Sequence, residues 1–216
     1  MIGQGFEKIC RAANPFTKAL LHKALKILKP ISKRKMKIEI ISGSPRKDSV
    51  SFRVALFLKA HLGSRPNYQV DILDVREWNL PLLQEVFTSV EATPDAYKPL
   101  SKRIFDADAF ILLSPEYNGS YTPALKNLLD HYPKQARKAF GIVTASPGMM
   151  GGMRATQQMQ LLVNAFFGIA SPHMLIVPGV DKKFNAEGNL VDEGFRKSID
   201  VFTNEFCWLA ERLKGL

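Results

Sequence analysis

Short apolar segments alternate with amphipathic segments from residue 37 to the end of the chain. Ile38, Ile40 and Ile41 are typical of the first kind, because β-branched side chains on both faces of a segment indicate a buried strand. The apolar segments predict strands at residues 37–42, 68–73, 109–113, 140–145 and 173–177. The other segments place apolar side chains at helical spacing, which predicts helices near residues 50–62, 95–106, 121–130, 152–168 and 192–213.

Strands that are apolar on both faces and separated by helices are typical of a parallel sheet with helices on both sides. The alternation therefore predicts an α/β protein, a flavodoxin-like doubly wound five-stranded sheet with strand order 2-1-3-4-5. In such a sheet the ligand crevice lies at the carboxyl edge of the strands, where the order reverses between strands 1 and 3. We expect the loops after strands 1, 3 and 4 to carry the ligand-binding residues.

The first 36 residues follow a different pattern, which predicts an N-terminal amphipathic helical extension to a domain over residues 37–216. Apolar positions between residues 6 and 27 follow helical spacing, while lysines occupy another face. Such a helix can dock on the domain or on a partner subunit, or it can lie on an anionic membrane surface. A third alternative is that Met36 is the natural start of the protein.

The formal net charge of +10 belongs mainly to this extension. Residues 1–37 hold ten basic residues and one acid, whereas the rest of the chain holds 20 basic and 19 acidic residues. A nearly neutral domain does not indicate nucleic-acid binding, because that function needs a basic surface on the domain itself. The positive charge therefore belongs to the extension. The partner that it suggests is an anionic membrane surface at most.

Length and composition exclude several other classes of protein. With 216 residues, 46% of them hydrophobic, the chain is long enough to bury a full core. No apolar run approaches the roughly 18 residues of a membrane span. Cys10 and Cys207 are too few and too far apart for a disulfide framework or a zinc site. We expect no metal site and a cytoplasmic location, with any membrane contact peripheral, at the inner surface.

The loop after the first strand, Gly43-Ser44-Pro45-Arg46, leads into a helix and has the chemistry of an anion site. Glycine permits a tight turn, and the N–H groups at a helix start carry the positive end of the helix dipole. Hydroxyls and a guanidinium add donors suited to a phosphate ester; they belong to Ser44, Arg46, Ser49 and Ser51. Ser49 or Ser51 can also cap the helix. The alternative is an ordinary strand-to-helix turn with a solvated Arg46.

Two more loops at the same predicted edge carry ligand-type residues. Residues 114–121, SPEYNGSY, offer an aromatic ring, an amide and a glycine that lets backbone approach a planar heterocycle. Residues 146–152, SPGMMGG, offer a glycine-rich rim, and the neighbouring methionines suit an adaptable apolar wall or ordinary core packing. Each loop alone is typical of a turn, but three loops at one edge indicate a binding site.

In these motifs the chain resembles the NADPH-dependent FMN reductases, which include soluble quinone and chromate reductases and azoreductase-like enzymes. The resemblance extends from about residue 37 to about residue 177. Four motifs carry it: GSPRKDS at 43–49, LPLLQE at 80–85, PEYNGSYTPALKNLLD at 115–130 and SPGMMGG at 146–152. Position 51 is Ser where many relatives have Asn, and position 83 is Leu where an aromatic residue is common. The difference at position 83 concerns the pocket for the electron acceptor.

The resemblance implies that FMN is the cofactor. Its phosphate would be held at Ser44, Arg46, Ser49 and Ser51. The isoalloxazine ring would lie against Pro115, Glu116, Tyr117, Asn118 and Gly119, with Ser146, Gly148 and Gly151 bordering the ring or its ribityl chain. We expect no catalytic side chain, because a flavin carries the chemistry itself. Glu116 would have a positioning role at most.

The implied activity is an NAD(P)H-dependent FMN reductase, with NADPH or NADH as co-substrate. It would pass electrons by a ping-pong cycle to a small-molecule acceptor, namely a quinone, a flavin, an azo compound or a metal ion. Two alternatives stay open: a non-enzymatic electron carrier of flavodoxin type, and a membrane-surface flavoprotein that acts through its basic N-terminal helix. The family also suggests a homodimer or tetramer.

Overall fold

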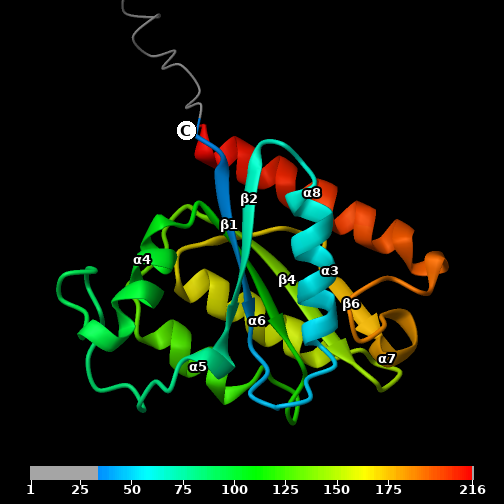
Figure 1. Ribbon diagram of the computed structural model, residues 1–216, viewed down its shortest axis with the longest axis horizontal. Coiled ribbons are helices and arrows are strands. Elements are labelled where there is room, and N and C mark those ends of the chain that lie inside the picture. Colours follow the sequence, from blue (N-terminus) through cyan, green and yellow to red (C-terminus); the bar gives the residue numbers. More distant parts are fainter. Residues whose placement is uncertain (1–33, 216) are drawn as a thin grey trace, which may run out of the picture. The chain divides into compact units, whose positions relative to one another are not determined.

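A computed structural model describes residues 34–215 of the chain, and these residues contain one parallel sheet (Figure 1). Its hydrogen-bonded path runs β2-β1-β3-β4-β5, and β6 also pairs with β4. The strands are β1 (Met36–Ser42), β2 (Tyr68–Asp74), β3 (Ala109–Ser114), β4 (Ala139–Ser146), β5 (Ile169–Ala170) and β6 (Leu175–Pro178). The flavodoxin-like class and the strand order expected from the sequence are confirmed.

The fifth predicted strand, residues 173–177, is only partly right. Two short strands, β5 and β6, occupy that edge of the sheet, and both pair in parallel with β4. Pro172 lies between them and has no N–H to donate to a neighbouring strand, so the pairing is interrupted there. His173 and Met174, which the pattern assigned to the strand, lie in the connection.

Helices follow the strands as the pattern predicted, with shifted ends. They are α3 (Phe52–Gly63), α4 (Lys98–Asp106), α5 (Pro123–Asp130), α6 (Met153–Ala165), α7 (Val180–Lys183) and α8 (Arg196–Lys214). Short 3₁₀ turns cover Val75–Glu77, Asp95–Tyr97 and Glu193–Phe195. The predicted helix at 95–106 therefore divides into a 3₁₀ turn and α4, which has a proline in its first turn. The four-residue α7 was not predicted.

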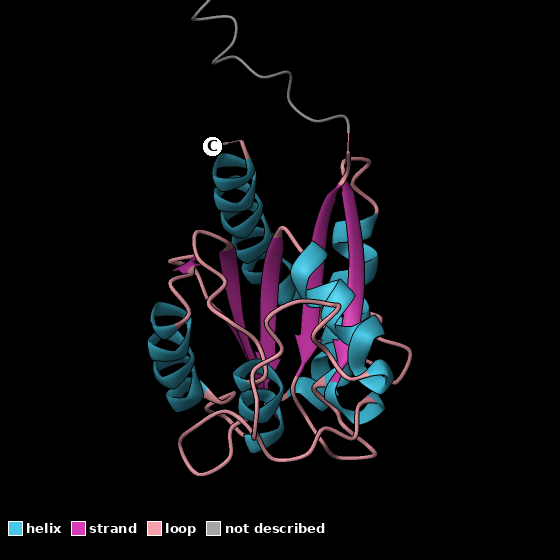
Figure 2. Ribbon diagram, turned by 90° about the vertical axis from the view of Figure 1, so that its left-hand side faces the viewer, coloured by secondary structure: helices cyan, strands magenta, loops and turns pink. Residues whose placement is uncertain are grey.

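The sheet separates two apolar cores, and helices cover both of its faces (Figure 2). One core contains side chains of α3, α7 and α8, and the other contains side chains of α4, α5 and α6. Successive residues of a strand point to opposite faces. Accordingly, Ile111 and Leu113 lie in the first core, whereas Phe110 and Leu112 lie in the second. This explains why the strands are apolar at nearly every position.

The predicted extension lies almost entirely outside the described residues. Its last residue, Met36, starts β1 and is 5% exposed, one residue ahead of the predicted strand. The boundary at residue 36 between an N-terminal extension and the domain remains a prediction. Among residues 34–215, no helix has the length and apolar character needed to cross a membrane.

The closeness of β4 to α8 generates a stability prediction at Gly141. A Cβ atom at this position would lie 2.9 Å from Phe202 Cζ and 3.1 Å from Phe206 Cδ2. Because overfilling a packed core forces neighbours to shift, Gly141→Ala should lower the free energy of unfolding by about 1–3 kcal/mol, measured by urea denaturation. Gly63→Ala is the matched control, since no atom lies within 4 Å of its added Cβ. Equal unfolding midpoints for the two variants would contradict this packing.

Candidate functional site

The carboxyl ends of β1, β3 and β4 meet at one edge of the sheet. Ser42, the last residue of β1, is in register with Leu113 of β3, and Ser114 is in register with Thr144 of β4. The loops that follow these strands, residues 43–51, 115–122 and 147–152, are therefore neighbours. The edge predicted to hold the site does bring the three ligand-type loops together.

Two hydrogen bonds at Gly43 anchor the first loop to the second. The Gly43 N–H donates to the Leu113 carbonyl at 2.8 Å, and the buried Thr122 hydroxyl donates to the Gly43 carbonyl. Thr122 Oγ1 also accepts from the Leu125 N–H at 3.2 Å and so caps the N-terminus of α5. A Cβ at Gly43 would lie only 2.9 Å from Leu125 Cβ. Glycine is therefore required here by packing.

The first loop, residues 43–51, presents a set of donors with few partners in the protein. Within the described part of the chain, the N–H groups of residues 47–51 donate to no backbone carbonyl. Ser44 Oγ accepts from the Arg46 N–H at 3.4 Å, which leaves its own proton available. Ser49 and Ser51 share one hydrogen bond of 2.9 Å between their hydroxyls. The proton of Ser44, one proton of the Ser49–Ser51 pair and several N–H groups thus remain able to bind an anion.

The expected capping role of Ser49 or Ser51 is wrong. Ser51 occupies the N-cap position of α3, but it adopts helical backbone angles, φ −66° and ψ −26°, and its side chain makes no capping bond. Backbone carbonyls satisfy the first turn instead, since Ser49 O accepts from Phe52 N at 3.2 Å and Ser51 O accepts from Val54 N at 3.0 Å. The hydroxyls are consequently not occupied at the helix end.

Arg46 links the first loop to the second through an aromatic ring. Its guanidinium carbon lies 5.2 Å from the centre of the Tyr117 ring, within the range of a cation–π contact. Among residues 34–215, no carboxylate lies within 4.0 Å of its side-chain nitrogens. An exposed guanidinium held beside the loop without an acidic partner is a suitable ligand for a phosphate.

The second loop forms a tight turn at Asn118 and Gly119. Both residues have positive φ, 50° and 86°, and Tyr117 and Ser120 exchange backbone hydrogen bonds of 2.8 and 3.1 Å across them. This Asn-Gly pair matches the preference of a type I′ turn, which needs positive φ at both central positions. A Cβ at Gly119 would have no atom within 4 Å, so this side of the turn faces open space.

The third loop is joined to the second by Glu116. Its carboxylate accepts from the Arg154 N–H at 3.1 Å and from the Arg154 guanidinium at 3.4 Å, close to the N-terminus of α6. Within the third loop, Ser146 Oγ accepts from the Gly148 N–H at 3.0 Å. Gly151 has φ 60°, and its Cβ would lie 2.7 Å from Pro178 N, so no other residue fits there. Glu116 therefore positions two loops.

Arg76 braces the first loop from its outer side. Its guanidinium makes bidentate hydrogen bonds to Asp74 and donates to the Lys47 carbonyl at 2.8 Å. It also lies 4.6 Å from the centre of the Phe52 ring. The hydrogen bonds that Arg76 donates to Asp74 raise the pKa of Arg76. This arrangement holds the loop backbone in place without using Arg46.

The LPLLQE segment, residues 80–85, is held against α5 by Asn127. The Asn127 amide donates to the Pro81 carbonyl at 2.8 Å and accepts from the Leu83 N–H at 3.2 Å. Leu82 is 80% exposed, and Met149 in the third loop is 95% exposed. These apolar side chains are the kind of surface to which a flat aromatic molecule binds.

Several of these residues were not selected from the sequence. Thr122, Arg76 and Asn127 make the bonds that fix the loops, although the sequence motifs assigned no role to any of the three. Thr122-Pro123 is a detectable signal, because a threonine followed by proline is typical of an N-cap and the first helical position. The pairing of Arg76 with Asp74 is local, but its bond to the first loop has no local signal, since the Lys47 carbonyl lies 29 residues away.

The donor set of the first loop fits a phosphate monoester, and the turn of the second loop leaves room for a flat ring beside it. N–H groups, hydroxyls and one guanidinium supply hydrogen-bond donors, and no carboxylate competes for the guanidinium in the described part of the chain. No group of three or more His, Cys, Asp or Glu residues suited to a metal ion occurs among residues 34–215. The expectation of a phosphate-binding site without metal ligands stays a prediction for the whole chain.

A family model described as NADPH-dependent FMN reductase matches residues 36–181. A probable NADPH:quinone oxidoreductase 2 from Oryza sativa is 30% identical over 196 residues, which cover 85% of this chain and 93% of the relative. An FMN-dependent NADPH-azoreductase from Staphylococcus saprophyticus is 29% identical over 178 residues, 79% of this chain and 93% of the relative.

Solved structures agree with the fold. The flavoenzyme FerB, an NAD(P)H:acceptor oxidoreductase from Paracoccus denitrificans, superimposes with a TM-score of 0.68 at 22% identity. The match covers 82% of this chain and 98% of that one. At this identity the similarity establishes the architecture of the sheet and its helices.

The bond between Thr122 and Gly43 generates a prediction about the coupling of the two loops. Thr122→Val keeps the shape but leaves the Gly43 carbonyl and the Leu125 N–H unpaired, so the free energy of unfolding should fall by about 1–3 kcal/mol. Urea denaturation measures this change. The susceptibility of the first loop to limited proteolysis should rise as well. Thr93→Val is the control, because it removes a buried hydroxyl that bonds to Ser89 and Ser101 instead. Greater protease sensitivity at the first loop in both variants would contradict the assigned role.

Proposed function

This chain belongs to the NADPH-dependent FMN reductase family, and from that premise we propose that it oxidises NADPH through bound FMN and reduces a small aromatic acceptor. The observation that carries the proposal is the gathering of unpartnered N–H groups, three hydroxyls and Arg46 in one loop beside the Tyr117 turn. A phosphate group satisfies this set of donors, and a flat ring suits the adjoining turn. The enzyme class, an oxidoreductase, follows from the family.

FMN supplies the hydride and electron transfers when it is bound, so the protein needs no nucleophile or metal for that step. The residues of the first loop, Ser44, Arg46, Ser49 and Ser51, would hold the phosphate. Pro115, Glu116, Tyr117, Asn118 and Gly119 would lie along the ring, and Ser146, Gly148 and Gly151 would border it. Glu116 accepts hydrogen bonds from Arg154, so we assign its carboxylate a positioning role.

The surface at this edge suits a quinone or an azo compound as the electron acceptor. Exposed apolar side chains stand on two segments at this edge, with Leu82 on one and Met149 on the other. Leu83 replaces the aromatic residue common at its position and is 39% exposed. Flexible apolar side chains can adapt to several flat molecules, and we propose that the enzyme accepts more than one of them.

The phosphate assignment predicts a clear effect of Arg46→Ala. Hydrogen bonds to charged groups contribute roughly 1.5–3 kcal/mol, so the affinity for FMN should fall at least about tenfold. Fluorescence titration of the released and rebound flavin measures it. Arg65→Ala is a matched control, because Arg65 also lies over a tyrosine ring, Tyr68, at 6.0 Å, but away from the loop. An unchanged affinity in Arg46→Ala would remove Arg46 from the site.

The reaction itself predicts a kinetic pattern. With NADPH and menadione as substrates, initial rates should give parallel lines in double-reciprocal plots, because one site is used in turn by the donor and the acceptor. NADH in place of NADPH shows which nucleotide is preferred. Absence of NADPH oxidation by protein that has been loaded with FMN would reject the enzyme and favour an electron carrier. Intersecting lines would reject the ping-pong cycle alone.

A further inference from the structure

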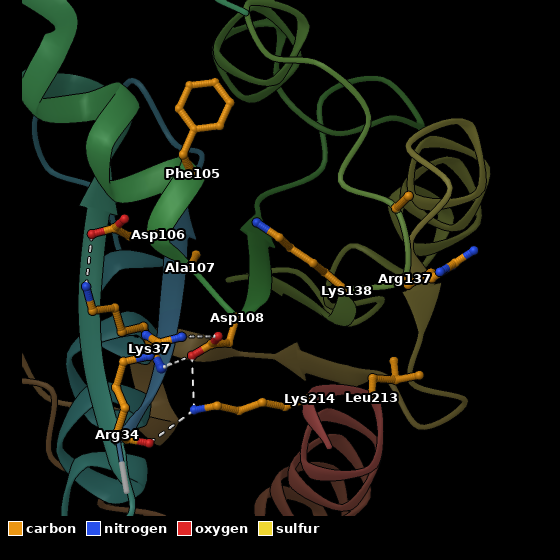
Figure 3. A pocket seen from close by; sticks show the side chains of 11 residues that line it. Arg34, Lys37, Phe105, Asp106, Ala107, Asp108, Arg137, Lys138, Leu213 and Lys214 are labelled. Atoms are coloured by element: carbon orange, nitrogen blue, oxygen red, sulfur yellow. Dashed lines mark hydrogen bonds and ion pairs between the residues drawn. The ribbon is translucent and has the colours of Figure 1, made fainter. Parts of the chain in front are cut away.

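A second concave surface lies at the opposite, amino-terminal edge of the sheet. It is a cavity of about 600 Å³. Its walls come from the start of β1, the end of α4, the turn before β4 and the end of α8 (Figure 3). Because these elements have no part in the loops at the carboxyl edge, the cavity is separate from the proposed FMN site. It has no role in the function derived above.

The lining of this cavity, which we call the amino-edge pocket, is strongly basic. It contains Arg34, Lys37, Arg137, Lys138 and Lys214 against two acids, Asp106 and Asp108. The pocket therefore has a formal net charge of +3. Over the whole chain beyond residue 37, basic residues exceed acids by only one. Of the charge of the pocket, Arg34 and Lys37 contribute +2, and the lining beyond residue 37 contributes the remaining +1.

The two aspartates are already engaged. Asp108 lies 2.6 Å from the Arg34 guanidinium and 3.3 Å from Lys214 Nζ, and it also accepts from the Lys37 N–H. Asp106 pairs with Lys37 at 2.9 Å and with Lys102 at 3.2 Å. In Figure 3 the dashed lines converge on these acids, while none reaches the side chain of Lys138. Each carboxylate is therefore shared between cations.

Lys138 is the cation whose surroundings call for an anion. Its side chain is half-buried, and its Nζ donates to two neutral oxygens, Gln135 Oε1 at 2.9 Å and the Ile104 carbonyl at 3.4 Å. Among residues 34–215, no carboxylate lies within 4.0 Å of it. Burial lowers the pKa of Lys138 to about 8, although Asp106 and Asp108 oppose the shift. A bound anion would offset this cost of burying the ammonium group.

The bond to Ile104 has a structural role as well, since it places a cation at the C-terminus of α4, where the helix dipole favours positive charge. The bonds to Ile104 and Gln135 use two of the three protons of the ammonium group, and the centre of the Phe110 ring lies 5.2 Å from Nζ. These bonds leave one proton of Lys138 without a hydrogen-bond acceptor among residues 34–215, and they do not account for the net charge of the pocket.

We propose that the amino-edge pocket binds a phosphate group, with Lys138 as its principal ligand and the surrounding cations supplying the field. The shared chemistry is an oxyanion of a phosphate ester. It can come from a soluble metabolite or from the headgroup of an anionic lipid. The seven basic residues and one acid in the 33 residues before Arg34 add positive charge to the same chain.

Calorimetric titration of inorganic phosphate into the full-length protein, loaded beforehand with FMN so that the first loop is filled, tests the proposal. Wild-type protein should bind phosphate saturably. Lys138→Met should weaken binding at least about tenfold, as expected for the loss of a charged ligand. Lys197→Met, an exposed lysine on α8 outside the pocket, loses the same charge and should bind as wild type does.

Vesicle sedimentation distinguishes the two sources. If the ligand is a lipid headgroup, phosphatidylglycerol vesicles should retain the wild-type protein better than Lys138→Met, while phosphatidylcholine vesicles retain neither. If the ligand is a soluble ester, Lys138→Met should affect phosphate binding alone. No saturable phosphate binding, together with vesicle retention that does not depend on Lys138, would overturn the proposal.

A measurement on the unmodified protein guards against a variant that fails to fold. An amine-acetylating reagent should label Lys138 more slowly when phosphate is present, whereas labelling of Lys197 should not change. Peptide mass spectrometry gives both rates in the same sample. Equal labelling of Lys138 with and without phosphate would also overturn the proposal.

Discussion

The hydrogen bond from the Thr122 hydroxyl to the Gly43 carbonyl joins the two loops on which the proposed cofactor site depends. Gly43 opens the loop with the free donors, and Thr122 ends the loop that carries the Tyr117 turn and begins α5. One buried side chain thus ties together the two loops that are proposed to hold the phosphate and the flat ring. Its position is maintained because Leu125 packs against Gly43, which leaves no space for a side chain there.

Most charged groups around this site serve to hold loops in place. Arg76 is bound to Asp74 and to the backbone of the first loop, and Glu116 is bound to Arg154. Each pair fixes one loop against its neighbour. Arg46, by contrast, lies over an aromatic ring without a carboxylate partner in the described part of the chain. This division explains how a site with several charges nearby can still offer a free cation to a ligand.

The two edges of the sheet differ because every helix between parallel strands has the same direction relative to the sheet. Helix N-termini lie at the carboxyl edge, where N–H groups and the dipole attract anions. Helix C-termini lie at the amino edge, where cations such as Lys138 and Lys214 complement exposed carbonyls. At that edge five cations and two aspartates line one pocket. Anion binding is proposed at both edges, for different physical reasons.

The sequence by itself determined the order of strands and helices, the parallel sheet and the loops that carry the ligand-type residues. Its apolar pattern is local, since the burial of a strand such as Ile38–Ile41 and the period of a helix are recorded in neighbouring positions. Tertiary structure decided the way in which Thr122 and Arg76 hold the first loop. That arrangement depends on contacts between distant residues, 79 positions apart for Thr122 and Gly43. A linear pattern records which residues are present, whereas only the packed chain decides which of them meet.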